Sequence, residues 1–294
     1  MQTYYDGAHS IIFCPVKTFL DANESNINTD TNPNFGGKHT WEDWGLVPLS
    51  RPYVSAPKVK TNTLEINGAN GIVDLTEVPL GFPVYQNRTG TWEFAMANDR
   101  VFNNDGTPLP WDRQLAVIMG YLHGRTVCAI LTDDMSYYYS GRVQVSQISA
   151  DTMYTKITLE YDLYPYKRMI WTTTGPWQWN PFDFIYGRVQ SSDFVDLEVH
   201  SSDQGSQLIK TYNSDMIGDE PIVPTIIFES ETGQPCIMAV NNYGYGETKH
   251  FTIEDGITRD PQLMFVCPYP DDKCIISLYG GNGKVSIKLR PGRL

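Results

Sequence analysis

Glycine and proline interrupt this chain at short, irregular intervals. Because both residues break regular secondary structure, they limit the length of its helices and strands. The 294 residues include 24 glycines and 19 prolines, which follow no fixed period. The segments between them are short and rich in Val, Ile, Thr and Tyr, which favour β-strands. Collagen-like and low-complexity classes are therefore excluded. The pattern predicts a mainly β protein.

One segment has helical periodicity. Residues 110–121 (PWDRQLAVIMGY) begin with a proline, and Gly124 lies just past their end, both of which are helix-boundary signals. Spacings of i, i+4, i+7 and i+11 put four apolar side chains on one face: Trp111, Leu115, Ile118 and Leu122. Strands are predicted on both sides rather than in alternation with further helices, which argues against a doubly wound α/β fold.

The first half of the chain otherwise reads as strands and turns. Residues 21–40 (DANESNINTDTNPNFGGKHT) have little to bury and predict a long loop. In residues 82–97 we expect a strand pair around a turn at Thr89-Gly90. The other strands expected in this half are 9–20, 43–47, 58–66, a short strand around 73–75, 126–132, 137–145 and 152–162.

Residues 165–187 contain three prolines and three tryptophans, and we place a domain boundary there, near residue 175. This predicts an N-terminal β-sandwich-like domain with one helix (1–175) and a C-terminal domain (176–294). The C-terminal domain shows short strands divided by turns, the pattern of a jelly-roll β-sandwich. These strands are expected at 195–199, 222–228, 237–241, 249–253, 262–266, 275–279 and 284–289.

Charge and cysteine usage exclude several classes of protein. With 34 acidic and 22 basic residues, the net charge is −12, which disfavours binding to nucleic acid or anionic membranes. The five cysteines show no CxxC spacing, so neither a disulfide framework nor a zinc site is indicated. We expect buried, inert thiols in a reducing compartment. No signal peptide or membrane span is recognised, so folding in the cytoplasm is expected.

No segment carries a recognisable catalytic, cofactor-binding or metal-binding motif. Asp133 and Asp134 are adjacent and predict a turn or strand end rather than a catalytic pair. Residues 280–284 (GGNGK) lack the hydroxyl of a phosphate loop and predict a hairpin turn. Residues 103–106 only partly match a calcium loop and also predict a turn. The five histidines are scattered along the sequence, so the chain is not expected to be an enzyme.

Three tryptophans near the predicted boundary have two interpretations. Exposed indole rings stack on sugar rings, so Trp171, Trp177 and Trp179 are candidate contacts for carbohydrate or for a partner protein. Alternatively, they fix the interdomain linker against the two domains.

Several segments, read in order, resemble one known family. The most specific parts are Asp-Trp-Gly-Leu, Ile-x-Gly-x-x-Gly-x-x-Asp-Leu-Thr, Tyr-Tyr-x-Gly-Arg-Val and Tyr-Asp-x-x-Pro-Tyr-Lys. They occur within residues 40–54, 59–77, 122–145 and 155–168. Together with 83–96, these segments are similar to the distal tail (Dit) proteins of long-tailed phages and prophages. The resemblance covers about residues 9–168.

The resemblance implies a structural virion protein of the phage tail tip, assembled in the host cytoplasm. Members of this family form a homo-hexameric ring through the N-terminal domain and often carry a galectin-like C-terminal domain. The ring joins the tail tube protein to the baseplate, with a tail-associated hub or lysin-type protein and a receptor-binding protein among the implied partners. The tape measure protein and DNA pass through its channel, which an acidic lining suits.

Two expectations on contacts remain open at this point. We expect residues 21–39 and 98–109 to contact neighbouring proteins. The alternative function is a carbohydrate-binding module, in which the C-terminal sandwich binds host cell-wall saccharides; the short C-terminal domain leaves no room for an inserted sugar-binding module of the kind found in some family members.

Overall fold

The structure, a computed structural model, describes residues 9–16, 36–68, 70–97, 106–107, 109–150, 154–170, 182–183, 188–189, 197–200, 208–213, 217–269 and 271–294. The chain divides into two compact units. Unit 1 comprises Met1–Thr76 and Pro83–Ile170, and unit 2 comprises Glu77–Phe82 and Trp171–Leu294. The boundary predicted near residue 175 falls outside the described residues and stays a prediction.

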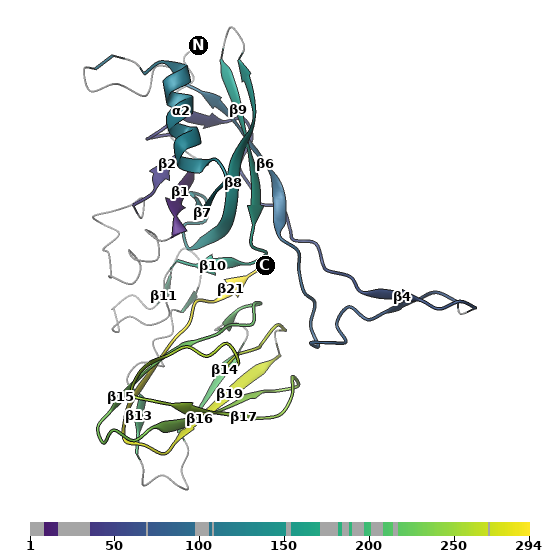
Figure 1. Ribbon diagram of the computed structural model, residues 1–294, viewed down its shortest axis with the longest axis vertical. Helices are drawn as coiled ribbons and strands as arrows, with labels where there is room; N and C mark the ends of the chain where they lie inside the picture. The colour runs from purple at the N-terminus through teal and green to yellow at the C-terminus, as the bar shows by residue number, and fades with distance from the viewer. Residues whose placement is uncertain are drawn as a thin grey trace. The chain divides into compact units, whose positions relative to one another are not determined.

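Unit 1 is built on one antiparallel sheet (Figure 1). Its strand order is β2-β1-β7-β8-β9-β6-β3, and β10 (Lys167–Met169) pairs with β8. The strands of the main path are β1 (Ile11–Pro15), β2 (Lys38–His39), β3 (Leu46–Pro48), β6 (Arg88–Met96), β7 (Arg125–Leu131), β8 (Tyr137–Ala150) and β9 (Thr155–Leu163). The longest pairings join β9 to β8 and β6.

Alternating side chains build the core of unit 1. In β9, Ile157, Leu159 and Leu163 are buried, and they lie opposite Phe94, Trp92 and Arg88 of β6. The helix α2 (Trp111–Leu122) packs on β7 and β8 and buries Ile118 and Leu122. Burial of these apolar side chains is the main force that holds the sheet and helix together.

The helix lies where its periodicity predicts, with two differences on its buried face. Trp111, expected on that face, is 44% exposed. Gln114 is buried instead, and its Nε2 donates a hydrogen bond to the Trp44 carbonyl. Apolar periodicity alone cannot identify a buried glutamine, because its burial depends on a carbonyl supplied by a distant turn.

The predicted turn at Thr89-Gly90 is wrong. β6 runs through both residues as one nine-residue strand paired with β9. A Cβ on Gly90 would lie 2.4 Å from the Tyr161 hydroxyl, so the glycine makes room for a ring packed on the strand. The Gly90 signal therefore reflects close packing rather than a chain reversal.

Unit 2 is a sandwich of two four-stranded antiparallel sheets. One has the order β13-β20-β15-β18 and the other β14-β19-β16-β17. Their strands are β13 (Leu197–Val199), β14 (Leu208–Asn213), β15 (Thr225–Ser230), β16 (Cys236–Asn242), β17 (Lys249–Ile253), β18 (Gly256–Thr258), β19 (Lys273–Tyr279) and β20 (Gly283–Lys288). Short pieces complete the unit: β11 (Phe182–Asp183) pairs with β12 (Arg188–Val189), and β21 (Gly292–Arg293) lies at the C-terminal end.

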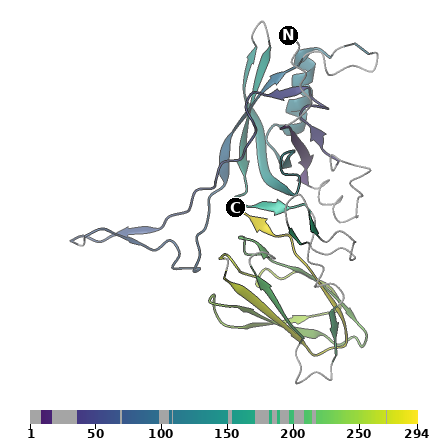
Figure 2. The ribbon, with the colours of Figure 1, turned by 180° about the vertical axis from the view of Figure 1, so that it is seen from behind.

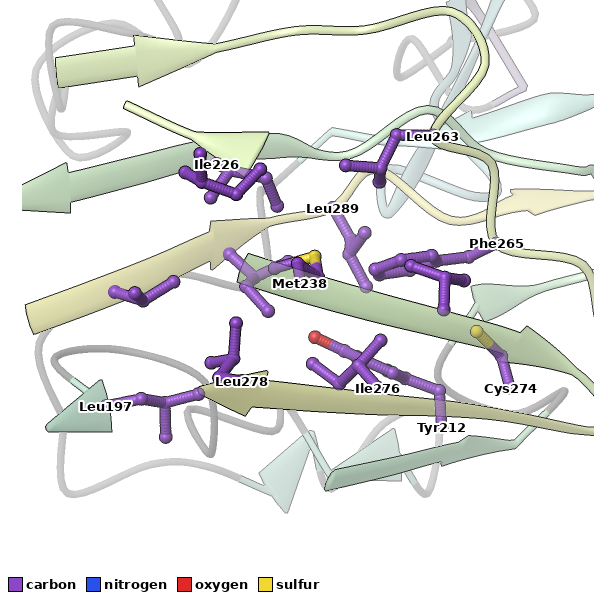
Figure 3. Packing of buried hydrophobic residues seen from close by; sticks show 14 of the residues in the cluster. Leu197, Tyr212, Ile226, Met238, Leu263, Phe265, Cys274, Ile276, Leu278 and Leu289 are labelled. Carbon is purple, nitrogen blue, oxygen red and sulfur yellow. The ribbon is translucent and has the colours of Figure 1, made fainter. Parts of the chain in front are cut away.

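The core of unit 2 lies between these sheets. Figure 3 shows Met238, Ile276 and Leu278 from one sheet and Ile226 from the other among the buried side chains. The rings of Tyr212 and Phe265 lie 5.1 Å apart. Tyr212, Ile226 and Phe265 are completely buried. The predicted fold class is confirmed: the protein is mainly β, with one helix in the described residues and a C-terminal sandwich. The likeness to galectin stays a prediction.

Two details of unit 2 differ from expectation. Residues 262–266 form an isolated bridge between Phe265 and Ile222 rather than a full strand. The turn at 280–284 is not a hairpin, because β19 and β20 belong to different sheets. Gly281 and Gly283 have positive φ angles and lie against backbone of residues 235 and 229, so glycine is required for this sharp crossing between sheets. The strands on both sides agree with the rejection of a phosphate loop.

The cysteines are buried, as predicted. No pair of the five, all of which lie in described residues, forms a disulfide. Burial raises the pKa of the Cys14 and Cys236 thiols to about 11 and that of Cys267 to about 12. Among the described residues, no helix is long and apolar enough to span a membrane.

Candidate assembly surface

A two-stranded extension of unit 1, which we call the arm, is the most unusual feature of that unit. It consists of residues 56–76 and 83–87, between β3 and β6. Near its root, backbone hydrogen bonds join Lys60 to Val84 and Gln86 to Lys58. Farther out, β4 (Thr63–Glu65) and β5 (Ile72–Asp74) pair as an antiparallel ribbon. Figures 1 and 2 show this ribbon away from the sheet in both views.

Buried polar contacts fix the root of the arm to the sheet. Arg88, at the start of β6, is 4% exposed. Its Nη1 donates to the Ser55 carbonyl at 2.9 Å and its Nε to the Pro165 carbonyl at 2.6 Å. The Ser55 amide donates to the Tyr161 hydroxyl at 3.2 Å, and Trp92 Nε1 donates to the Tyr53 carbonyl at 2.9 Å. The arm therefore leaves the sheet from a defined anchor.

The ribbon has one apolar and one mostly polar face. Leu64 lies opposite Val73 in the register, whereas Thr63 lies opposite Asp74 and Glu65 opposite Ile72. Because side chains alternate along a strand, Ile66 and Leu75 share the face of Leu64 and Val73. Glu65 and Asp74 share the other face with Thr63 and Ile72.

The apolar face is open to solvent. Leu64 is 52%, Ile66 50% and Val73 42% exposed. A two-stranded ribbon without a covered face is marginally stable in water at best, and exposed apolar side chains gathered in one place mark interaction surfaces. The arrangement is that of a surface built to be covered by another molecule.

This ribbon is the segment Ile-x-Gly-x-x-Gly-x-x-Asp-Leu-Thr of the sequence resemblance. Gly68 and Gly71 have φ angles of 88° and 84°, which glycine adopts readily. The Thr76 amide donates to Asp74 Oδ1 at 2.9 Å, and the hydrogen bonds from Thr76 lower the pKa of Asp74. The strand pair was predicted, and the alternation of Leu64 with Ile66 and of Val73 with Leu75 was the signal that these side chains share one apolar face.

The Asp-Trp-Gly-Leu segment forms a tight turn between β2 and β3. Asp43 accepts hydrogen bonds from the His39 amide at 2.7 Å and from Lys38 Nζ at 2.8 Å. The amides of Trp41 and Glu42 donate to His39 Nδ1, each at 3.2 Å. Burial lowers the pKa of His39, with Glu42 and Asp43 acting in the opposite direction. These hydrogen bonds give the motif a structural role, because they stabilise the turn that joins β2 to β3.

The other two motifs lie where β8 and β9 meet. Gly141, in the Tyr-Tyr-x-Gly-Arg-Val segment, pairs with Leu163, and a Cβ there would lie 2.2 Å from the Asp162 carbonyl oxygen. The Tyr-Asp-x-x-Pro-Tyr-Lys segment ends β9 and supplies Pro165, whose carbonyl accepts a hydrogen bond from Arg88 Nε. Both motifs therefore serve packing near the arm's root.

The adjacent aspartates have different partners. Asp133 and Asp134 lie in the turn after β7. Asp133 contacts His9 Nδ1 and accepts from Arg51 Nε, both at 2.7 Å, whereas Asp134 pairs with Lys167 at 3.0 Å. The hydrogen bonds and charges of His9 and Arg51 outweigh desolvation and lower the pKa of Asp133. The turn prediction is confirmed, and the two carboxylates form ion pairs with different residues.

The remaining predicted contacts fall largely outside the described residues. Trp171, Trp177 and Trp179 lie there, as do residues 21–35 of the first expected contact loop and residues 98–105 and 108 of the second. Their roles stay predictions. In the described ranges, no group of three or more His, Cys, Asp or Glu is arranged to hold a metal ion.

Comparison with solved structures finds similar chains, one of which is described here. No family model and no curated protein matches the chain. The chain is similar in structure to SPP1 Dit, which is described as "a Paradigm of Hub Adsorption Apparatus in Gram-positive Infecting Phages". That match has a TM-score of 0.49 and 12% sequence identity, and covers 83% of this chain and 93% of the other.

Proposed function

We propose that this protein is a structural hub of a phage tail tip, a virion protein that works by assembly rather than catalysis. Copies of the chain form a homo-hexameric ring through the N-terminal domain. The ring connects the tail tube protein to the baseplate, the tail-associated hub protein and the receptor-binding protein. The tape measure protein and DNA pass through its centre. The family resemblance of residues 9–168 motivates this assignment.

The observation that carries the proposal is the arm. Its root is fixed by Arg88, Trp92 and Tyr161, while its ribbon exposes Leu64, Ile66 and Val73. A covered ribbon gains apolar burial that an isolated chain cannot provide. A ring needs two different patches on each subunit, and the ribbon supplies one of them.

The test compares the oligomeric state of the full chain with that of an arm variant. In the variant, residues 63–74 are replaced by a Gly-Asn-Gly turn, which keeps the bridge between Val59 and Tyr85. Light scattering and negative-stain imaging over a concentration series should show six-fold rings for the natural chain and folded monomers for the variant. Rings formed equally well by the variant, or monomers of the natural chain at every concentration, would contradict the proposal.

A second candidate function is binding of neutral cell-wall saccharide by unit 2. The outer face of the β14-β19-β16-β17 sheet favours it, because no Asp, Glu, Lys or Arg occupies its central positions. The register places these residues together there: Ile237, Ala239, Asn241, His250, Thr252, Ile275, Ser277 and Tyr279. His250 Nδ1 and the Tyr279 hydroxyl are 2.9 Å apart. Such a mixture of apolar and uncharged polar groups suits sugar rings and their hydroxyls.

Binding of the full chain to immobilised neutral polysaccharides tests this second function. Tyr279→Ala should reduce binding at least tenfold, whereas Ile257→Ala, on strand β18 of the other sheet and 71% exposed, should leave it unchanged. Absence of binding by the natural chain, or equal effects of the two substitutions, would remove this candidate.

A further inference from the structure

Three asparagines of the chain are followed directly by glycine: Asn67, Asn70 and Asn282. An asparagine in this position is prone to spontaneous loss of its side-chain amide, because glycine has no Cβ to hinder attack by its own backbone nitrogen. The first two lie in the turn of the ribbon, between β4 and β5, and the third lies directly before β20 of unit 2. The sequence therefore presents the same dipeptide in two structural environments.

The turn of the ribbon leaves both of its Asn-Gly pairs open. All four residues of the two pairs are exposed. Among the described residues, a Cβ placed on Gly68 or on Gly71 would meet nothing within 4 Å. The last register pair before the turn is Glu65 with Ile72, so both Asn-Gly pairs lie beyond the paired part of the ribbon. Each asparagine side chain can therefore approach the backbone nitrogen that follows it.

The third Asn-Gly pair is confined by neighbouring backbone. The Glu231 amide donates to the Asn282 carbonyl at 2.8 Å. Gly283 is buried, lies in register with Ser230 of β15, and also pairs with β13. A Cβ on Gly283 would overlap the Glu229 carbonyl oxygen, so the strands approach closely here. The rotation that brings Asn282 Cγ onto the Gly283 nitrogen would disrupt this packing, and the fold therefore protects the third pair.

The reaction at an Asn-Gly pair consumes only water. The glycine nitrogen gives its proton to solvent, and its electron pair attacks Cγ of the preceding asparagine to form a five-membered succinimide ring. The bond between Cγ and Nδ2 breaks, and Nδ2 takes up a proton and leaves as ammonia. Water then opens the ring. Aspartate results when the new bond to Cγ breaks, and isoaspartate results when the original peptide bond breaks. No atom is oxidised or reduced.

We propose that Asn67 and Asn70 form a site of spontaneous modification at the turn of the ribbon, where both convert to aspartate and isoaspartate while Asn282 stays intact. Each conversion adds a negative charge to a ribbon that already carries Glu65 and Asp74, and isoaspartate also adds a methylene group to the backbone. Like charges on paired strands oppose their pairing, and a two-stranded ribbon is only marginally stable. The modification therefore loosens the pairing of β4 with β5. This inference does not depend on the proposed hub function.

Mass spectrometry of peptides from the full chain, sampled during incubation at pH 8, tests the proposal. Each conversion raises the peptide mass by about one dalton, and fragment ions separate Asn67 from Asn70. In the native protein, both should convert at least tenfold faster than Asn282. In denaturant, where Asn282 loses its strand partners, the three rates should agree within about fivefold. Equal rates in the native protein, or slow conversion of Asn282 in denaturant as well, would overturn the proposal.

Isoelectric focusing provides an independent measurement on the intact chain. The natural chain should develop two additional acidic bands, one charge apart. Asn67→Gln combined with Asn70→Gln should develop neither, because glutamine has to close a less favourable six-membered ring. Asn62→Gln is the matched control, since Asn62 is an exposed asparagine of the arm that is followed by threonine, and it should develop the same bands as the natural chain. Persistence of both bands in the double variant would assign the new charges to other residues and overturn the proposal.

Hydrogen exchange in residues 63–74 tests the effect on the ribbon. The aged natural chain should exchange these amides faster than the fresh chain, whereas the double variant should exchange them equally before and after incubation. Unchanged exchange in a fully converted natural chain would contradict the loosening of β4 and β5.

Discussion

At the residue scale, two glycines of this chain lie in opposite environments, one tightly packed and one open, and the sequence does not distinguish them. Gly141 lies where β8 and β9 approach so closely that a Cβ would meet Asp162 O at 2.2 Å and Leu163 Cα at 2.6 Å. Gly120 lies in α2, where a Cβ would meet nothing within 4 Å. The two glycines form a matched pair for mutation.

We expect Gly141→Ala to lower the free energy of unfolding by about 3 kcal/mol, because the two backbones must separate to admit the methyl group. Gly120→Ala should raise it by about 0.5–1 kcal/mol, because alanine loses less backbone entropy in a helix. Urea unfolding followed by tryptophan fluorescence measures both. Equal effects of the two substitutions would contradict the close approach of β8 and β9.

His39 predicts a pH dependence of stability. Its Nδ1 accepts from the amides of Trp41 and Glu42, and burial lowers its pKa in the folded state. The unfolded chain therefore binds a proton more readily, near the ordinary histidine pKa of about 6.5. This contribution to stability is present above that pH and is lost as the pH falls below it, by at most about 1.4 kcal/mol per pH unit.

Urea unfolding between pH 7.5 and 5 checks this prediction. In the control His39→Asn, the amide oxygen replaces Nδ1 as acceptor and does not titrate, so the slope in this range should decrease. Glu42, Asp43 and Lys38 surround His39 and remain in both proteins. The same slope in the control would assign the effect to other groups.

At the element scale, the arm is held by its root. Arg88 is buried and donates to the carbonyls of Ser55 and Pro165. Ser55 precedes the arm and Pro165 follows β9, so the guanidinium joins two separate segments of the chain. Loss of this guanidinium leaves two buried carbonyls without their donor, and the cost of an unsatisfied buried group is about 1–3 kcal/mol.

Arg88→Met is therefore expected to destabilise unit 1 by about 2–3 kcal/mol and to increase amide exchange in residues 53–60. Arg88→Lys should fail to restore the natural protein, because an ammonium group cannot reproduce the fork of the guanidinium. Hydrogen exchange read by mass spectrometry measures the effect. Unchanged exchange at the root in both variants would show that the arm is anchored by other contacts.

The sequence predicted elements best where one local pattern determined them. The helix and the strands β7, β9 and β17 lie close to their predicted positions because periodicity and flanking turns agree there. Gly90 was misread as a turn and the residues 280–284 as a hairpin, because both depend on distant partners, Tyr161 and Glu229. The ribbon was predicted as strands, but its exposure depends on the absence of a covering layer, which no local pattern records.

At the scale of the whole molecule, the reactivity of the five cysteines can serve as a probe of the folding of both units. Cys14 and Cys128 lie on paired strands of unit 1, and Cys236, Cys267 and Cys274 lie in the core of unit 2. Burial raises the pKa of four of these thiols. Because the thiolate is the reactive form, burial and raised pKa both protect them.

We therefore expect all five thiols to react at least about 100-fold more slowly with a disulfide reagent at pH 8 in the native protein than in denaturant. Intermediate denaturant concentrations should release two thiols and three thiols in separate steps if the units unfold independently. Mass spectrometry of the labelled peptides identifies the order. Fast labelling of any one cysteine in the native protein would contradict its burial.

The pairing of β1 has a consequence for synthesis on the ribosome. Ile11 pairs with Leu131 and Pro15 with Val127, so the first strand leaves the exit tunnel long before its main partner, β7, has been translated. Until then the two-residue β2 is the one partner of β1 among the described residues. Ile11 and Phe13, which later become fully buried, are not yet covered by β7. Sheets assembled from such distant segments form slowly and expose aggregation-prone edges meanwhile. Chaperone binding to the nascent segment that contains β1 should therefore raise the yield of native protein.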